Sequence, residues 1–146
     1  MLDERIRRNV VENPGDEFAF YNHSEVVAAE EDYVAVRLVI RPESMNPYGV
    51  VHGGMLYTLA DEATGGAVHT DGRAYVTQSG TLHFLRNASD GEIRAESRVV
   101  HRGKSTALAN VEITDEAGNL LATGEYTYFC IGSSFEETSG QDLSGK

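Results

Sequence analysis

A histidine followed by two glycines marks the part of the sequence best suited to chemistry. His52, Gly53 and Gly54 precede a segment, 55–69, that lacks proline and carries small apolar residues at helical spacing. The first N–H groups of a helix have no partner within it and lie at the positive end of its dipole, so they can bind an oxyanion or polarise a carbonyl. Glycine lets a ligand approach such a backbone closely. The simpler alternative is that the glycines only form the turn and that His52 caps the helix or packs in the core.

Two adjacent acids inside this segment could supply the other half of such chemistry. Asp61 lies seven residues after Gly54, close to two helical turns, so both can lie along one helix face near Tyr57 and Gly65. A carboxylate in mid-helix beside a stripe of small residues is uncommon unless it has a function. The alternative is a solvated acidic patch, and we favour that interpretation for Glu62, which lies about 100° further round the helix.

A locally basic segment offers a place for phosphate groups. Residues 73–104 hold six bases against three acids, a net charge of +3, whereas the rest of the chain holds six bases against twenty acids, a net charge of −14. Two cations flank a glycine turn beside His101, and another basic residue ends a neighbouring strand. The alternative is an ordinary hairpin with solvated charges. The candidate phosphate ligands are Arg86, Arg102, Gly103, Lys104 and Ser105.

The composition as a whole excludes several classes of protein. The chain has 146 residues and a net charge of −11, which argues against nucleic-acid binding, because that binding depends on Lys and Arg that neutralise phosphates. No apolar run exceeds four residues and the first residues lack the apolar core of a signal peptide, so we expect no membrane span and no secretion. The single cysteine, Cys130, cannot form an internal disulfide, and no residues show metal-ligand spacing. We therefore expect a cytoplasmic protein without a metal.

The hydrophobic pattern predicts one helix among several strands. We expect a surface helix in 2–12, strands in 33–41, 74–85, 92–102, 105–114 and 120–131, and the central helix from Gly53 to His69. Turns at 87–91, 102–104 and 115–119 are short enough for hairpins between consecutive strands. The fold class is α+β, a long antiparallel sheet with one central helix on a face. We expect helices and loops in 1–32, the main domain in 33–131 and a tail without fixed structure in 132–146.

The order of the motifs resembles the hotdog-fold acyl-CoA thioesterases of the PaaI type. The residues that carry the resemblance are Asn46, Gly49, His52-Gly53-Gly54, Leu59 to Ala63, Val76-Thr77, His83 to Arg86 and His101 to Ser105. The resemblance covers about 33–131 and implies a hotdog fold, in which the long sheet is wrapped around the central helix. It also implies that two subunits join their sheets and that the thioester lies at their interface, in a homodimer or homotetramer.

The resemblance further implies roles for individual residues. The Gly53 N–H polarises the thioester carbonyl, and Asp61 attacks it or deprotonates water. Asn46 holds the water or the thioester from the facing subunit, His52 orients the loop or bonds the substrate, and Thr77 places a hydroxyl near the nucleophile. The substrate is an acyl-CoA, and no cofactor is expected besides the CoA that it carries. The residues expected to bind the acyl or CoA part are Gly54, Tyr57, Glu62, Phe84, Arg86, Arg102, Gly103, Lys104 and Ser105.

Three positions depart from the family pattern. Ser79 and Thr81 stand where many relatives have an acid and an asparagine, and Asn87 replaces a frequent proline. These positions affect the acyl pocket more than the reaction, so the acyl group stays open among aryl-acetyl, benzoyl-like and medium-chain aliphatic groups.

Two other functions compete with hydrolysis. A hotdog module that only binds acyl-CoA would be expected to lose the carboxylate, yet Asp61 is present. A hotdog hydratase or dehydratase is less favoured, because those enzymes combine a histidine with an acid in arrangements that the His52 motif does not reproduce.

Overall fold

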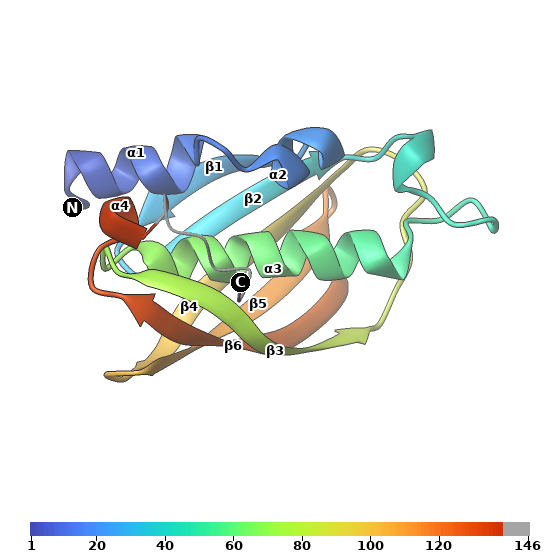
Figure 1. Cartoon of the computed structure of the whole chain (residues 1–146). Helices are drawn as coiled ribbons and strands as arrows, with labels where there is room; N and C mark the ends of the chain where they lie inside the picture. The colour runs from blue at the N-terminus through green and yellow to red at the C-terminus, as the bar shows by residue number, and fades with distance from the viewer. Residues whose placement is uncertain (139–146) are drawn as a thin grey trace, which may run out of the picture.

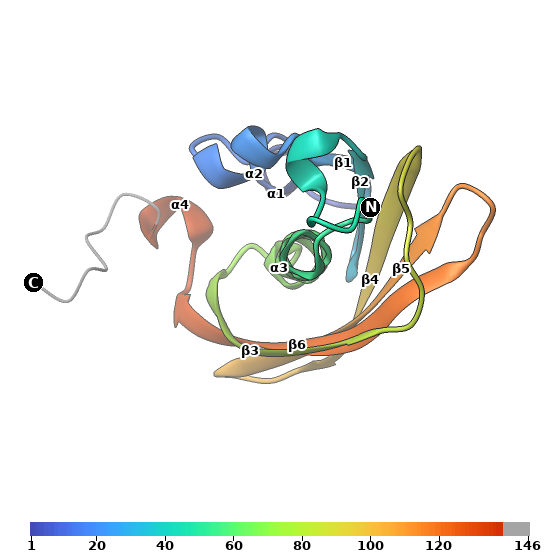
Figure 2. The same cartoon turned by 90° about the vertical axis from the view of Figure 1, so that its right-hand side faces the viewer.

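A curved six-stranded antiparallel sheet surrounds one long helix in the computed structural model, which describes residues 1–138 (Figure 1). The strands are β1 (Glu25–Glu30), β2 (Tyr33–Val39), β3 (Ala74–Phe84), β4 (Glu92–Arg102), β5 (Thr106–Asp115) and β6 (Leu120–Gly132). The helices are α1 (Glu4–Glu12), α2 (Glu17–Asn22), α3 (Gly53–His69) and α4 (Phe135–Thr138), with a 3-10 turn at Pro42–Ser44. The sheet order is β1-β2-β4-β5-β6-β3. A view along α3 shows the sheet curving round the helix, with α1 and α2 on its other side (Figure 2).

Small side chains allow α3 to lie close to the sheet. Ala60, Ala63 and Ala67 are completely buried. At Gly66 an added Cβ would lie only 3.0 Å from a methyl group of Val34. Alternate residues of the strands point toward α3 and form the opposite side of the core, as the sequence pattern predicts. These residues include Leu38, Ile93, Val111 and Tyr126. The predicted α+β class and the wrapped central helix are therefore confirmed.

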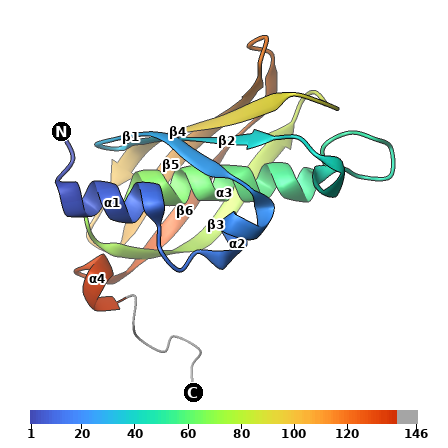
Figure 3. The same cartoon turned by 90° about the horizontal axis from the view of Figure 1, so that it is seen from above.

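The segment 1–32 contains a strand that the sequence analysis missed. β1 pairs with β2 and forms one edge of the sheet, and α2 follows a cap in which the Asp16 carboxylate accepts the Ala19 N–H at 3.0 Å. The strand has an acid at each end and four consecutive apolar residues between them, so its sequence does not alternate. Helix α1 lies along β1 and over the C-terminal half of α3 (Figure 3).

The predicted hairpin at 87–91 is wrong. β3 pairs with β6 at the far side of the sheet, while β4 pairs with β2. The connection instead crosses the N-terminal end of α3, where Ala88 accepts the N–H of Val51 at 2.9 Å and Gly91 accepts the N–H of Ile40 at 2.8 Å. Turn-forming residues indicate that the chain changes direction, but they do not determine which strands pair.

The expected structureless tail, 132–146, is partly ordered. Gly132 ends β6, and α4 follows, with the Phe135 N–H donating to Gly72 O at 2.9 Å and Thr138 buried. Residues 139–146 lie outside the described part of the chain.

The outer edge of β3 is unpaired within the described residues. This strand is 11 residues long, and only its inner edge bonds to another strand, β6. A long free edge is a ready site for pairing with another chain. Across residues 1–138 no helix combines the length and apolar character needed to cross a membrane.

Candidate active site

Two hydroxyl groups orient the carboxylate of Asp61. Thr77 Oγ1 and the Tyr128 hydroxyl each lie 2.8 Å from Asp61 Oδ1 and donate to it. Tyr128 also reaches the Asp61 carbonyl at 2.8 Å and the Thr64 hydroxyl at 2.7 Å. Burial and the nearby Asp61 charge raise the pKa of Tyr128, which keeps it a donor. Asp61 Oδ2 accepts no hydrogen bond from residues 1–138, so this oxygen is available to a water molecule or a carbonyl.

The start of α3 presents one open N–H group. His52 is the N-cap, and its Nδ1 accepts the Gly54 N–H at 2.8 Å. A Cβ on residue 54 would lie 3.0 Å from that nitrogen, so glycine lets the ring approach. The Gly53 N–H has no acceptor within the described part of the chain, and the ring of Phe84 lies beside it, 3.6 Å from where a Cβ would be. His52 therefore caps the helix, and Gly53 rather than Gly54 supplies the free donor.

The loop before α3 is held in shape by Asn46. Its Oδ1 accepts the N–H groups of Tyr48 at 3.0 Å and Val50 at 3.3 Å, an Asx turn. The His52 N–H donates to Ser44 O at 2.9 Å and fixes the end of the loop. The Asn46 oxygen is thus used internally, which leaves its NH2 group as the part that can meet a ligand.

One chain cannot bring Gly53 and Asp61 to the same carbonyl. They lie eight residues apart on α3, which is about 12 Å along the helix axis. A donor and an attacking group must each lie about 3 Å from the reacting atoms. The shared helix face expected from the sequence is present, but its two chemical groups are too far apart to act together.

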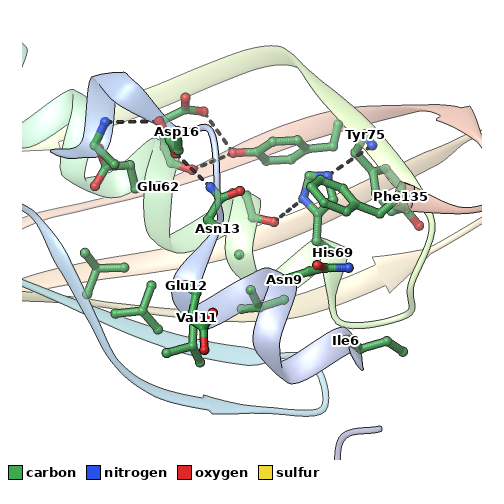
Figure 4. A pocket seen from close by; sticks show the side chains of 18 of the residues that line it. Ile6, Asn9, Val11, Glu12, Asn13, Asp16, Glu62, His69, Tyr75 and Phe135 are labelled. Carbon is green, nitrogen blue, oxygen red and sulfur yellow. Dashed lines mark hydrogen bonds between the residues drawn. The ribbon is translucent and has the colours of Figure 1, made fainter. Parts of the chain in front are cut away.

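A cavity of about 980 Å³ lies along α3 and contains the Asp61 side chain. Its other walls come from α1, α2, the start of β3 and α4 (Figure 4). At one end His69 is half-buried, with Nδ1 donating to Gly65 O at 2.7 Å and Nε2 accepting the Tyr75 N–H at 3.2 Å. Burial lowers the pKa of His69, and Phe135 packs edge-on against its ring. His69 is therefore a neutral structural residue.

Glu62 is not the solvated acid that we expected. Its side chain lines the cavity, and its Oε1 is buried without a hydrogen-bond partner. Burial is the main reason that its pKa rises to about 7; the Ser24 side chain opposes this rise, and the charges of Asp16 and Asp61 add to it. Helical spacing places Glu62 beside Asp61, but only the packing of α1 and α2 over α3 buries it.

Tyr57 lies on the same side of α3, nearer its start. Its ring packs against Tyr126 at 5.0 Å between centroids, and its hydroxyl donates to Gly80 O at 3.3 Å. It also lines the cavity.

The candidate phosphate ligands do not lie together within one chain. Arg86 is exposed, donates to Asn119 Oδ1 at 2.9 Å, and follows Phe84 near the N-terminal end of α3. The turn at 103–105 lies at the opposite end, because the preceding Arg102 donates to Val68 O at 2.9 Å. Lys104 and Ser105 are exposed there.

The guanidinium of Arg102 has a structural role instead of the expected phosphate contact. It bonds Asp32 and Asp71, each at 2.8 Å, and only 21% of its side chain is exposed. It also binds carbonyls at the C-terminal end of α3, where a positive charge is favourable. Gly103 and Lys104 use their carbonyls to accept hydrogen bonds from Arg73, at 3.0 and 2.9 Å.

Tyr128 is the site residue that the sequence analysis missed. The alternation of Tyr126 and Tyr128 in the last strand places both toward the helix, and the register pairs Thr77 with Tyr128. The pattern was available from the sequence, but the pairing of β3 with β6 was not. Within residues 1–138 no group of three or more His, Cys, Asp or Glu residues is arranged to hold a metal ion.

Comparisons with known proteins identify relatives of this chain. The model of the thioesterase superfamily matches residues 48–122. The acyl-coenzyme A thioesterase PaaI of Escherichia coli is 29% identical over 99 residues, 67% of this chain and 71% of its own. The 1,4-dihydroxy-2-naphthoyl-CoA hydrolase of Listeria monocytogenes is 30% identical over 107 residues, 70% of this chain and 86% of its own.

Solved structures give the same result. The structure of E. coli PaaI has a TM-score of 0.86 and 26% identity and covers 92% of this chain and 99% of its own. A hypothetical thioesterase protein from Streptococcus pneumoniae, solved with coenzyme A, has a TM-score of 0.72 and 29% identity and covers 75% of this chain and 86% of its own.

Proposed function

The chain belongs to the thioesterase superfamily and is a thioester hydrolase of the PaaI type with a hotdog fold, and from this we propose that two copies together form the site that hydrolyses an acyl-CoA. The observation that carries the proposal is the separation of Gly53 from Asp61 along a single helix. A twofold axis near Tyr57, midway between them, would bring the Gly53 N–H of one subunit opposite the partner's Asp61. The same operation would repeat the site on the other side of the axis.

The free edge of β3 supports such a pair. Antiparallel pairing of two β3 strands would continue one sheet into the other and remove an unpaired edge from each subunit. It would also set the two α3 helices antiparallel. The cavity beside Asp61 would then be closed on its open side by the second subunit.

Each residue has a distinct role in the proposed reaction. The Gly53 N–H donates to the thioester carbonyl oxygen and stabilises the negative charge that develops there. Thr77 and Tyr128 hold Oδ1 of the carboxylate, so that Oδ2 of Asp61 faces the carbonyl carbon. The Asn46 NH2 group helps to hold the thioester or the water from the Gly53 side.

The carboxylate can act by two routes. As a general base, Asp61 takes a proton from water while the oxygen of that water attacks the carbonyl carbon; the tetrahedral intermediate expels CoA thiolate, which takes up the proton. As a nucleophile, Asp61 forms an anhydride and releases CoA thiolate, and water then cleaves the anhydride to the free acid and restores the carboxylate. Finding ¹⁸O in Asp61 after a single turnover in ¹⁸O-labelled water would establish the second route, because general-base catalysis places the label in the released acid alone.

The two-copy arrangement also brings the separated phosphate candidates together. Because the helices run antiparallel, the C-terminal end of one α3 lies beside the N-terminal end of the other. Arg86 of one subunit would then approach the partner's Lys104, and both are exposed cations suited to the phosphates of CoA. Arg102 is not part of this proposal, because its guanidinium is bonded internally. The single cysteine keeps a reducing cytoplasm as our proposed compartment.

A thiol-release assay over a panel of acyl-CoAs tests the proposed function. The wild-type protein should release CoA from at least one member, and Asp61→Asn should reduce kcat about a hundredfold or more, because the amide cannot attack or take a proton. Binding of acyl-CoA without release from any member would instead favour a binding module. Circular dichroism establishes that the variant is folded.

A further inference from the structure

Helix α2 covers the cavity without being anchored in the core. Phe18 and Phe20 line the cavity, yet they are 61% and 82% exposed, and the neighbouring Tyr21 is 76% exposed. None of residues 13–24, which hold α2 and the turns on either side of it, is buried. Helix α1, by contrast, buries Val10 in the core. A segment with few buried contacts opens at a lower free energy than the core, so residues 13–24 are the part of the cover that opens most easily.

Hydrogen bonds within residues 13–24 give this segment its shape. The carboxylate of Asp16 accepts the Asn13 side-chain amide at 2.8 Å and the Ala19 N–H at 3.0 Å. Toward the rest of the protein, Arg41 donates to Tyr21 O at 3.1 Å, but this bond is exposed and water competes for it. The segment is therefore a preformed unit that is weakly attached to what lies beneath it.

Glu62 meets this segment from the central helix. The Ser24 side chain contacts Glu62, and the charge of Asp16 acts on it. Asp16 and Glu62 lie at the end of the cavity away from His69 (Figure 4). Oε1 of Glu62 is buried without a hydrogen-bond partner. An ionised Glu62 would thus be a buried carboxylate opposite a second carboxylate, an arrangement that favours separation of the two elements.

Other charges near Glu62 do not compensate for this. Asp61, its neighbour on α3, adds a further negative charge. Two more acids line the cavity from α1 and β1, and each is paired with an arginine: Glu12 with Arg8 at 3.2 Å and Glu25 with Arg37 at 3.0 Å. Within residues 1–138 Glu62 itself pairs with no cation.

We propose that residues 13–24 form a lid over the cavity and that ionisation of Glu62 opens this lid. A neutral Glu62 can stay beneath the lid beside Asp16. Once Glu62 loses its proton, its charge reaches water most easily by displacing the lid, the least anchored part of the cover. This inference concerns access to the cavity whatever the substrate, so it does not rest on the proposed function.

The direction of the pH effect follows from where Glu62 titrates. Under the closed lid, burial raises the pKa of Glu62 from 4.5 to about 7, whereas an open lid would let it titrate near its ordinary value. The open form then binds fewer protons between these values, so opening becomes more favourable as the pH rises and levels off above about 7.

Limited digestion of the full-length protein with chymotrypsin tests the lid without any substrate. Chymotrypsin cuts after aromatic residues in unfolded segments, so an open lid exposes the bonds after Phe18, Phe20 and Tyr21. Mass spectrometry identifies the first cuts. Cleavage after Tyr48, which is 91% exposed and lies outside the cavity wall, is the internal reference. Between pH 6 and pH 8, cleavage in the lid relative to cleavage after Tyr48 should become about tenfold faster.

Substitutions then assign the effect to Glu62. Glu62→Gln cannot ionise, so its relative cleavage rate in the lid should stay constant over the same pH range. Asp16→Asn still caps α2 but lacks the opposing charge, so it should show a smaller rise than the wild type. Glu112→Gln, a change to an exposed acid of β5, is the matched control and should behave like the wild type.

Two results would overturn the inference. Equal rises in the wild type and in Glu62→Gln would show that Glu62 does not control the opening. First cuts spread over the core strands instead of residues 18–21 would show that pH acts on unfolding of the whole protein and that no separate lid exists. Neither result bears on the thioesterase proposal, which thiol release tests separately.

Discussion

Thr77 donates its hydroxyl hydrogen to Oδ1 of Asp61 across 2.8 Å, from a strand to the middle of the central helix. Tyr128 reaches the same oxygen at 2.8 Å. Because both donors bond Oδ1, the other oxygen, Oδ2, stays available to the substrate. The orientation of the reacting group therefore depends on the pairing of β3 with β6, which sets these two hydroxyls side by side.

Removing either hydroxyl should slow the reaction without weakening substrate binding. We expect Thr77→Val and Tyr128→Phe each to lower kcat about 10- to 100-fold with little change in KM, because they affect the orientation of Asp61 and not the CoA contacts. Steady-state thiol release measures both constants.

Thr127→Val is the matched control for these two variants. Thr127 lies between the inward-facing tyrosines of β6 and bonds the Ser79 hydroxyl at 2.6 Å, away from Asp61. Unchanged kcat in Tyr128→Phe would show that its bond to Asp61 has no part in catalysis.

Gly53 can be tested by removing its N–H alone. It is the first residue of α3 and follows an extended His52, with φ −62° and ψ 134°, so proline fits this position without breaking the helix. We expect Gly53→Pro to lower kcat about a hundredfold or more. Gly53→Ala keeps the N–H, and its Cβ would meet Phe84 at an ordinary 3.6 Å, so it should stay within about tenfold of wild type. Equal losses in the two variants would mean that the donor is not used.

The sequence predicts most elements of this fold and part of its site. Helical spacing locates α3, and alternation locates five of the strands within two residues at each end, because both periodicities are local. β1 was missed, since its ends are acids and no strict alternation marks it. The hairpin at 87–91 was wrong because turn residues do not specify which strands pair.

In the site, too, residues of a local motif could be predicted, whereas residues positioned by distant contacts could not. Gly53 and Asp61 belong to a local motif, so they could be identified directly. Tyr128 could not, because its role depends on the pairing of distant strands. Arg102 was expected to bind phosphate because the sequence does not reveal its contact with Asp32, which lies 70 residues away.

Glu62 makes the stability of the protein depend on pH in a defined direction. Burial raises the pKa of Glu62 from an ordinary 4.5 to about 7, so the native state keeps a proton that the unfolded state releases between these values. Its stabilising contribution is complete below pH 4.5 and is lost as the pH rises through about 7. The charges of Asp16 and Asp61 disfavour its ionised form, whereas the Ser24 side chain favours it.

Glu62→Gln should remove this dependence. Between pH 4.5 and pH 8, the free energy of unfolding of the wild type should fall by about 3 kcal/mol more than that of the variant, measured by urea denaturation. The lowered pKa of His69 has the opposite effect below pH 6.5, but it is present in both proteins and cancels. Parallel profiles would show that Glu62 ionises normally in the folded protein.

Complementation between two inactive variants tests most directly whether the site is formed by two copies. Gly53→Pro lacks the donor and Asp61→Asn lacks the carboxylate, and each alone should be nearly inactive. If the site joins Gly53 of one subunit to the partner's Asp61, a mixed dimer places both defects in one site and leaves the other intact. Unfolding and refolding the two variants together at equal amounts should then restore about a quarter of wild-type activity, since about half of the dimers are mixed and each has one working site. A mixture no more active than its separate components, with mixed dimers present by mass spectrometry, would contradict the two-copy site.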